Sequence, residues 1–196
     1  LRAIYFLARQ HKVALILDET YSDFVDDMPH DLFTMREWDY TLVHLMSFGK
    51  SYAITGYRAG LLAASPTLIQ QALKIQDTMT VCQPRITQLA LKYGLDNLDH
   101  WLEANRRLMN FRHNLFVNEF NLPGNRFRLA ASGSFFAWIR HPYEGRRGRE
   151  VAKRLLLDAG IMTLPGEAFG PGLEDYLRLA FGNIRESLIP EAIHRF

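Results

Sequence analysis

A lysine and an arginine eight positions apart are the residues of this chain best suited to chemistry. Lys50 and Arg58 belong to residues 47–60, which read SFGKSYAITGYRAG. A lysine amine attacks carbonyl carbons when it is held beside one in its neutral form. A guanidinium offers paired donors in fixed geometry to a phosphate or a carboxylate. On composition alone, a lysine after a strand is a solvated residue, so the case for chemistry depends on its neighbours.

Two short apolar runs lead into the polar residues that surround this lysine. Residues 13–17 end directly in Asp18, with Tyr21 three positions later, and residues 41–46 end in Ser47. Both runs are rich in branched residues, as is typical of strands buried in a parallel sheet. A site formed at strand ends can hold a lysine beside a carbonyl. We therefore expect the two runs to position Asp18, Ser47 and Lys50.

These two strand ends resemble the pyridoxal-5′-phosphate (PLP) site of the class I/II aminotransferases, the aspartate-aminotransferase-like, fold-type-I family. The lysine segment fits the family's attachment pattern: small, apolar, small, Lys, then Arg eight residues later, followed by an apolar and a small residue. The resemblance implies an α/β fold, with part of a large PLP-binding domain (a mostly parallel sheet with helices) followed by a small α+β C-terminal domain. It also implies PLP as the cofactor and transfer of an amino group from an L-amino acid to a 2-oxo acid.

The resemblance assigns roles to the residues around the cofactor ring. It implies that Lys50 forms the Schiff base with PLP and then shuttles the proton of the substrate Cα. It implies that Asp18 pairs with the pyridine nitrogen, whose protonated form a carboxylate favours, so that the ring accepts electrons. Tyr21 would bring its hydroxyl to the O3′ atom of the cofactor.

The anion-binding residues follow from the same resemblance. Ser47 and Arg58 would bind the cofactor phosphate, and Gly49, where relatives often have serine, would leave one phosphate donor missing. Arg178 belongs to residues 176–181, which follow a segment reading LPGEAFG at 164–170. The family's substrate segment has this combination, which implies that Arg178 forks the substrate α-carboxylate.

The remaining patterns indicate a large-domain part followed by a smaller domain. Residues 121–125, NLPGN, are the clearest boundary. We therefore expect residues 1–120 to form the C-terminal part of the large domain plus a long interdomain helix, and 121–196 to form the small domain. Ser65 and Pro66 predict a helix start. The expected helices are 1–11, 66–78, 84–95, 99–120, 148–159 and 183–196. The expected strands are 13–17, 41–46, 58–64, 127–130, 135–139, 161–164 and 176–181. Residues 23–38 are expected to form a loop with a little helix.

Composition narrows the function classes. The 23 basic and 21 acidic residues give a net charge of +2, which is too balanced to predict nucleic-acid binding, and the arginines of 140–149 are expected to be solvated. The seven histidines show no metal-ligand spacing, so no metal site is predicted. No apolar run reaches the roughly 18 residues that a membrane span needs. A single cysteine suits a reducing compartment, and the expected location is cytoplasmic.

The chain is expected to be a piece of a longer enzyme. It starts at Leu1 inside a helical pattern and corresponds to the C-terminal half of the family. The family's other cofactor contacts would precede Leu1, so this segment is expected to be inactive alone. Family resemblance implies a homodimer for the full-length protein.

Two alternatives remain open from the sequence. One is a PLP-dependent lyase or decarboxylase of the same fold, which would share Asp18, Tyr21, Lys50 and Arg58. The other is an aminotransferase-like sensor domain of a transcription regulator, behind an N-terminal DNA-binding module. Product analysis with a 2-oxo acid acceptor separates the first, and the sequence upstream of Leu1 separates the second. The amino acid and 2-oxo acid pair is left open.

Overall fold

The computed structural model describes residues 1–25 and 30–196, and they form two compact units. The first unit is Leu1–Arg106 and the second is Arg107–Phe196. Each unit combines a small sheet with helices, and each is described here by itself. Residues 26–29, within the expected loop at 23–38, lie outside the described residues.

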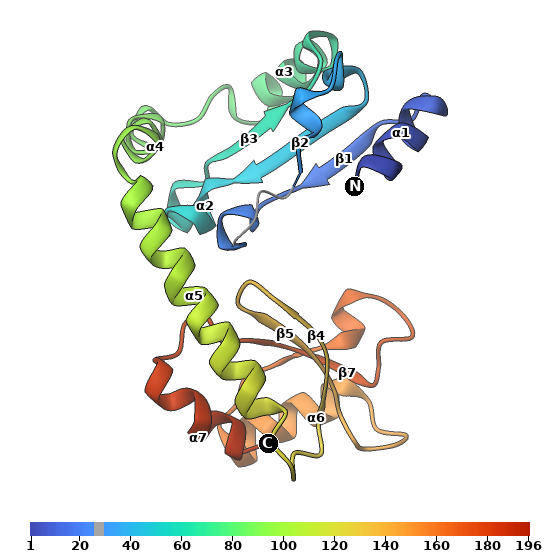
Figure 1. Ribbon diagram of the computed structural model, residues 1–196, viewed down its shortest axis with the longest axis vertical. Coiled ribbons are helices and arrows are strands. Elements are labelled where there is room, and N and C mark those ends of the chain that lie inside the picture. Colours follow the sequence, from blue (N-terminus) through green and yellow to red (C-terminus); the bar gives the residue numbers. More distant parts are fainter. Residues whose placement is uncertain (26–29) are drawn as a thin grey trace. The chain divides into compact units, whose positions relative to one another are not determined.

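The sheet of the first unit has three strands in the order β1-β2-β3 (Figure 1). Their bounds are Leu15–Asp18, Leu42–Ser47 and Gly60–Ala63. β1 and β2 run parallel, whereas β2 and β3 run antiparallel. Successive side chains of a strand point to opposite faces. One face packs on α1, and the core there is formed by Tyr5, Leu32, Leu42, Leu15 and Leu17.

The helices of the first unit follow the sequence pattern closely. They are α1 at Arg2–Gln10, α2 at Phe48–Ser51, α3 at Pro66–Thr80 and α4 at Arg85–Asn97. The predicted start of α3 is confirmed, because the Ser65 hydroxyl accepts the Leu68 amide hydrogen at 3.3 Å. The short helix α2 was not predicted; it carries Lys50 directly after β2.

The long helix α5, Asp99–Phe120, contributes to both units. Near its start, Leu102 packs with Phe48 and Tyr52. Near its end, Phe116 and Phe120 are buried in the core of the second unit. Because the two ends of one helix pack into different cores, the boundary between the two units lies within α5. The domain division at residues 120 and 121 stays a proposal.

The second unit is a four-stranded antiparallel sheet in the order β4-β5-β7-β6. The strands are Arg128–Gly133, Phe136–Arg140, Leu164–Pro165 and Tyr176–Ala180 for β4, β5, β6 and β7. Helix α6, Gly148–Arg154, continues into a π-helical turn at Leu155–Ala159, and α7 is Ile189–His194. One face of the sheet packs on these helices and α5; its core includes Ala137, Ile139, Leu177, Val151, Leu155, Ile189 and Ile193.

Two predicted elements of the second unit differ in extent. The strand expected at 161–164 is wrong, because β6 spans only Leu164–Pro165. The Ile161 amide donates instead to the Leu155 carbonyl of the preceding π-helical turn at 3.0 Å, and a 3₁₀ turn that begins at Gly166 ends β6. The helix expected at 183–196 starts later, with a 3₁₀ turn at Glu186–Leu188 followed by α7, whose first turn holds Pro190. In the described part of the chain, no helix is both long and apolar enough to cross a bilayer.

Candidate active site

Asp18 and Ser47 lie at the ends of two neighbouring parallel strands. Asp18 is paired with Leu45 across β1 and β2, and Ser47 follows Leu45 by two residues. Because side chains alternate along a strand, Asp18, Leu45 and Ser47 belong to the same face of the sheet. Parallel pairing thus brings the predicted carboxylate and hydroxyl to one edge, where both strands finish.

A tight turn after β1 fixes the Asp18 carboxylate. Its Oδ1 atom accepts hydrogen bonds from the Thr20 amide at 3.2 Å and from the Thr20 hydroxyl at 2.6 Å. Oδ2 makes no hydrogen bond with any described residue, and the side chain is exposed. Tyr21 is half-buried at the start of the following 3₁₀ turn, Ser22–Phe24. The turn leaves one carboxylate oxygen available to a ligand.

Lys50 is half-buried on α2, three residues beyond the end of β2. Its amine makes no hydrogen bond or ion pair with residues 1–25 or 30–196. Ser47 occupies the N-cap position of α2, yet its hydroxyl does not cap the helix. An amine and a hydroxyl without partners at one strand end are suited to a bound ligand rather than to the fold.

Arg58 reaches the same edge from the other side of β2. The Phe48 amide donates to the Ala59 carbonyl at 3.1 Å, and Ser47 is paired with Gly60. A Cβ on Gly60 would lie 3.0 Å from the Met46 carbonyl oxygen, so the close pairing needs glycine. Arg58 adopts the left-handed conformation with φ 54°, and its Nη1 donates to the Thr55 carbonyl at 3.1 Å. This uncommon backbone conformation is of the kind often retained at binding sites.

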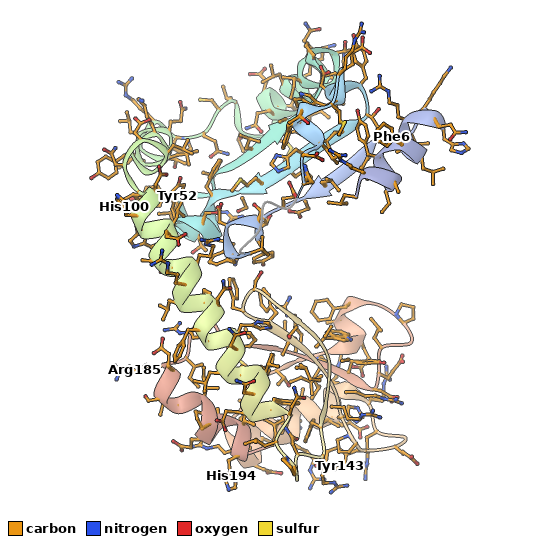
Figure 2. The ribbon with its side chains drawn as sticks, in the orientation of Figure 1. Phe6, Tyr52, His100, Tyr143, Arg185 and His194 are labelled. Atoms are coloured by element: carbon orange, nitrogen blue, oxygen red, sulfur yellow. The ribbon has the colours of Figure 1, made fainter. Side chains whose placement is uncertain are left out.

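Tyr52 directly follows α2 and packs with Phe48 of that helix. Tyr52 lies beside α2 (Figure 2). Its ring packs directly on Gly94 of α4, where an added Cβ would meet the ring at 3.2 Å. Burial raises the pKa of the Tyr52 phenol above its ordinary value of 10.0, and the negative charges of Asp23 and Asp99 raise it further. The Tyr52 phenol therefore stays neutral to a higher pH in the folded protein than in the unfolded chain.

Glu19, His30 and His44 form a buried polar cluster that the sequence did not reveal. Glu19 Oε2 lies 3.0 Å from His30 Nε2 and 2.9 Å from His44 Nε2. The available signal was alternation: Glu19 shares the inward face of β1 with Leu17, so it needs buried polar partners. The described residues contain no cluster of His, Cys, Asp or Glu arranged to hold a metal ion.

Arg178 lies in the second unit, at the centre of its sheet. It is paired with Trp138 of β5 on one side and with Leu164 of β6 on the other. Its neighbours Leu177 and Leu179 face the core, so Arg178 projects from the opposite face. The structure thus brings five of the predicted site residues to one sheet edge of the first unit, with Arg178 on the sheet of the second.

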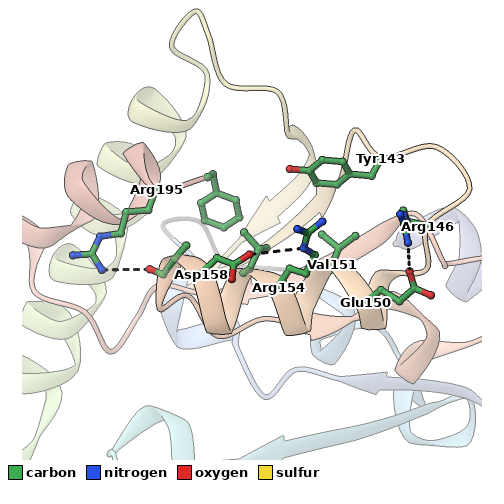
Figure 3. A pocket seen from close by; sticks show the side chains of 10 residues that line it. Tyr143, Arg146, Glu150, Val151, Arg154, Asp158 and Arg195 are labelled. Atoms are coloured by element: carbon green, nitrogen blue, oxygen red, sulfur yellow. Dashed lines mark hydrogen bonds and ion pairs between the residues drawn. The ribbon is translucent and has the colours of Figure 1, made fainter.

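A concave region of about 290 Å³ lies elsewhere in the second unit, along α6 and its π-helical turn (Figure 3). Arg146 and Arg154 line it, but each pairs with an acidic residue one helical turn away, Glu150 at 3.4 Å and Asp158 at 3.8 Å. These pairs are well exposed and balance the positive charge. The region is therefore a solvated helix surface on which these arginines are paired with acidic residues.

The comparisons with known proteins cover the whole chain. The family model for aminotransferase class I and II covers residues 1–196. The chain belongs to the class I and II aminotransferase family. The resemblance inferred from the sequence is therefore confirmed, and so is the α/β fold class.

Individual similar proteins show how much of their length the chain spans. A putative aminotransferase, YugH, of Bacillus subtilis is 30% identical over 96% of this chain and 49% of its own length. An aromatic aminotransferase from Pyrococcus horikoshii OT3 is 25% identical, with a TM-score of 0.83 over 99% of this chain and 52% of its own. A PLP-bound putative aminotransferase from Clostridium difficile 630 shares the fold at 18% identity and a TM-score of 0.84. The chain spans about half the length of these relatives.

Proposed function

We propose that the complete polypeptide containing this chain is a PLP-dependent aminotransferase that moves an amino group from an L-amino acid to a 2-oxo acid. The observation that carries the proposal is the parallel pairing of β1 with β2, which sets Asp18 and the Ser47–Lys50 segment at one edge. Family membership supports the same reaction class. The site geometry alone would also suit a lyase of the same fold; the family match and the aminotransferase relatives favour transamination over both alternatives.

The residues at this edge fit PLP as a cofactor. Lys50 and Ser47 offer an amine and a hydroxyl that have no partner among the described residues, and Asp18 offers one carboxylate oxygen. Arg58 adds a guanidinium for a phosphate dianion, and Tyr21 adds a phenol. When bound, PLP supplies an electron sink for the substrate carbon that loses its proton. The PLP-bound state of a structural neighbour agrees with this assignment.

Each residue then has a defined task in the proposed reaction. Lys50 would hold the cofactor through Nζ, and its neutral amine would accept the proton of the substrate Cα. Asp18 holds a positive charge at the ring nitrogen, and Ser47 and Arg58 hold the phosphate. Arg178 forks the α-carboxylate of the amino acid or 2-oxo acid.

The proposal also covers the domain division, the oligomeric state and the location of the complete polypeptide. Its domains are the large PLP-binding domain, ending with the long helix at residue 120, and the small domain at 121–196. We include a homodimer and a cytoplasmic location, for which the family and the single cysteine are the support. Light scattering on the complete polypeptide would test the dimer.

The decisive experiment measures product formation by the complete polypeptide. Purified protein with PLP, a panel of L-amino acids and 2-oxoglutarate should form L-glutamate, whereas a lyase or decarboxylase would leave the acceptor unchanged. Lys50→Ala should lose at least about a hundredfold in turnover, because it removes the proton-transfer group. Lys92→Ala, at an exposed lysine paired with Asp96 at 2.7 Å, is the matched control. Undiminished turnover in Lys50→Ala would refute the assignment.

A further inference from the structure

Arg178 is surrounded by aromatic side chains on the open face of the second sheet. Its guanidinium carbon lies 4.8 Å from the ring centroid of Phe136 and 5.0 Å from that of Phe169. Phe136 is a diagonal neighbour on β5, whereas Phe169 comes from the 3₁₀ turn after β6. Both distances are within the range of attraction between a cation and an aromatic ring.

A second layer of contacts fixes these rings. Trp138, opposite Arg178, meets the Phe169 ring edge-on at 5.4 Å and stacks on Tyr176 at 5.5 Å. Trp138 thus braces Phe169 from the sheet side. The position of Phe169 therefore does not depend on its own turn alone.

The turn that carries Phe169 is anchored to α6. Glu167 is 10% exposed; its Oε1 accepts the Arg149 amide hydrogen at 3.3 Å and lies 3.5 Å from Arg147 Nε. A Cβ on Gly166 would lie 2.0 Å from the Leu173 carbonyl oxygen, so the backbone is tightly packed there. Charge and packing therefore hold the turn in one place.

The guanidinium donors of Arg178 have no partner among the described residues. No side-chain hydrogen bond or ion pair joins this guanidinium to residues 1–25 or 30–196. Its N–H groups lie in the guanidinium plane, whereas the faces of that plane are weakly hydrated and stack on rings. Ring contacts therefore restrict the plane without using its donors.

We propose that Phe136 and Phe169 are positioning residues that hold the Arg178 guanidinium plane, so that its edge N–H groups meet the substrate α-carboxylate as a preformed fork. This inference rests on the proposed function of Arg178. Restricting a flexible arginine before the substrate arrives lowers the entropy lost on binding. The rings act through Arg178 and do not take part in proton transfer.

The test compares a carboxylate probe with its neutral amide on the complete polypeptide. Calorimetry measures binding of 3-phenylpropionate and 3-phenylpropionamide to wild type, Phe136→Leu and Phe169→Leu. Each variant should weaken the carboxylate by about fivefold to thirtyfold and leave the amide within about twofold, because the lost contact is to the cation. In turnover, the KM for the amino donor should rise by a similar factor with kcat nearly unchanged.

Three controls separate positioning from other effects. Phe169→Tyr keeps an aromatic ring and should bind the carboxylate as tightly as the wild type does. Phe111→Leu, at a residue 58% exposed on α5, should change nothing. Arg178→Gln should remove the difference between the carboxylate and the amide.

The outcomes distinguish this inference from the proposed function. If the protein transaminates and Arg178→Gln abolishes carboxylate preference, while both leucine variants bind as wild type does, the positioning role is refuted and the function stands. Equal weakening of carboxylate and amide would also refute it, because the rings would then contact the apolar part of the substrate. If no transamination occurs, the proposed function fails, and the calorimetric comparison still decides the role of the rings.

Discussion

Glu19 and His44 meet across the two parallel strands β1 and β2, with Glu19 Oε2 2.9 Å from His44 Nε2. The same oxygen lies 3.0 Å from His30 Nε2, and His30 Nδ1 accepts the Leu32 amide hydrogen at 3.1 Å. Glu19 directly follows Asp18 but belongs to the opposite face of the strand. The cluster therefore stabilises, on the opposite face of the sheet, the end of β1 that carries Asp18, the carboxylate predicted to contact the cofactor.

Replacing the shared carboxylate should destabilise the first unit. We expect Glu19→Gln to lower the free energy of unfolding by about 1–3 kcal/mol, because two nearly buried imidazoles lose a charged acceptor. Urea unfolding would measure the change. Glu37→Gln, at a residue 51% exposed and 3.2 Å from Arg9, should cost less than about 1 kcal/mol. Equal losses in the two variants would contradict a special role for Glu19.

Removing the charge of Asp18 should lower activity without unfolding the site. In Asp18→Asn the amide oxygen can still accept both Thr20 hydrogens, so the turn after β1 is retained. The ring nitrogen of the cofactor loses its counter-charge, and we expect turnover to fall about 10- to 1,000-fold. Steady-state kinetics and the thermal midpoint would be compared with those of Asp96→Asn, which alters an exposed pair on α4. A large fall in the thermal midpoint of Asp18→Asn would point to a structural role instead.

Tyr52 should make the folded state sensitive to alkaline pH. The pKa of its phenol is raised above 10.0 by burial and by Asp23 and Asp99. The folded protein therefore holds this proton more tightly than the unfolded chain. The stabilisation is fully present below about pH 10 and is lost as the pH rises through the folded pKa. Unfolding measured between pH 9 and pH 11 (roughly one unit to each side of the unfolded value) should show a steeper loss in wild type than in Tyr52→Phe.

Tyr40→Phe is the matched control for this experiment. Tyr40 is 80% exposed, so its replacement should leave the alkaline loss in place. Identical pH profiles for wild type and Tyr52→Phe would show that another group is responsible.

A methyl group at Gly166 should disturb the anchored turn below Phe169. In Gly166→Ala the new Cβ would lie 2.0 Å from the Leu173 carbonyl oxygen and 2.9 Å from that of Tyr176. Overpacking of this kind typically costs about 1–3 kcal/mol, and backbone contacts yield little. Calorimetric unfolding should show the loss. Gly133→Ala, with nothing within 4 Å of the added atom, should unfold as wild type does.

Local patterns predicted most elements of the fold because their causes are local. The hydroxyl of Ser65 and the ring of Pro66 start α3 through contacts within one turn, so they could be recognised in the sequence. The run before Asp18 was recognised as a strand, although β1 begins at Leu15, two residues later than expected. The last helix was predicted to begin at residue 183, but a 3₁₀ turn occupies Glu186–Leu188 and the α-helix begins only at Ile189.

The candidate site shows the same division between local and long-range causes. Lys50 and Arg58 could be predicted because their family pattern lies within residues 47–60, and Asp18 because it directly follows the apolar run at 13–17. The environment of Arg178 could not, because its rings come from β5 and from the turn after β6, far apart in the chain. Likewise, the Glu19 cluster depends on contacts that folding makes between residues 11 and 25 positions apart in the sequence.

The order of residues by itself determined the family and the succession of strands and helices, because short-range sterics and hydrophobic spacing act along the chain. It also predicted Lys50 as the attachment lysine. Only the tertiary structure decided which side chains keep unused donors and which are enclosed. Burial and hydrogen-bond satisfaction depend on neighbours that folding brings from distant positions. The Lys50 amine, which has no partner among the described residues, and the Arg178 guanidinium beside two rings are therefore properties of the folded protein.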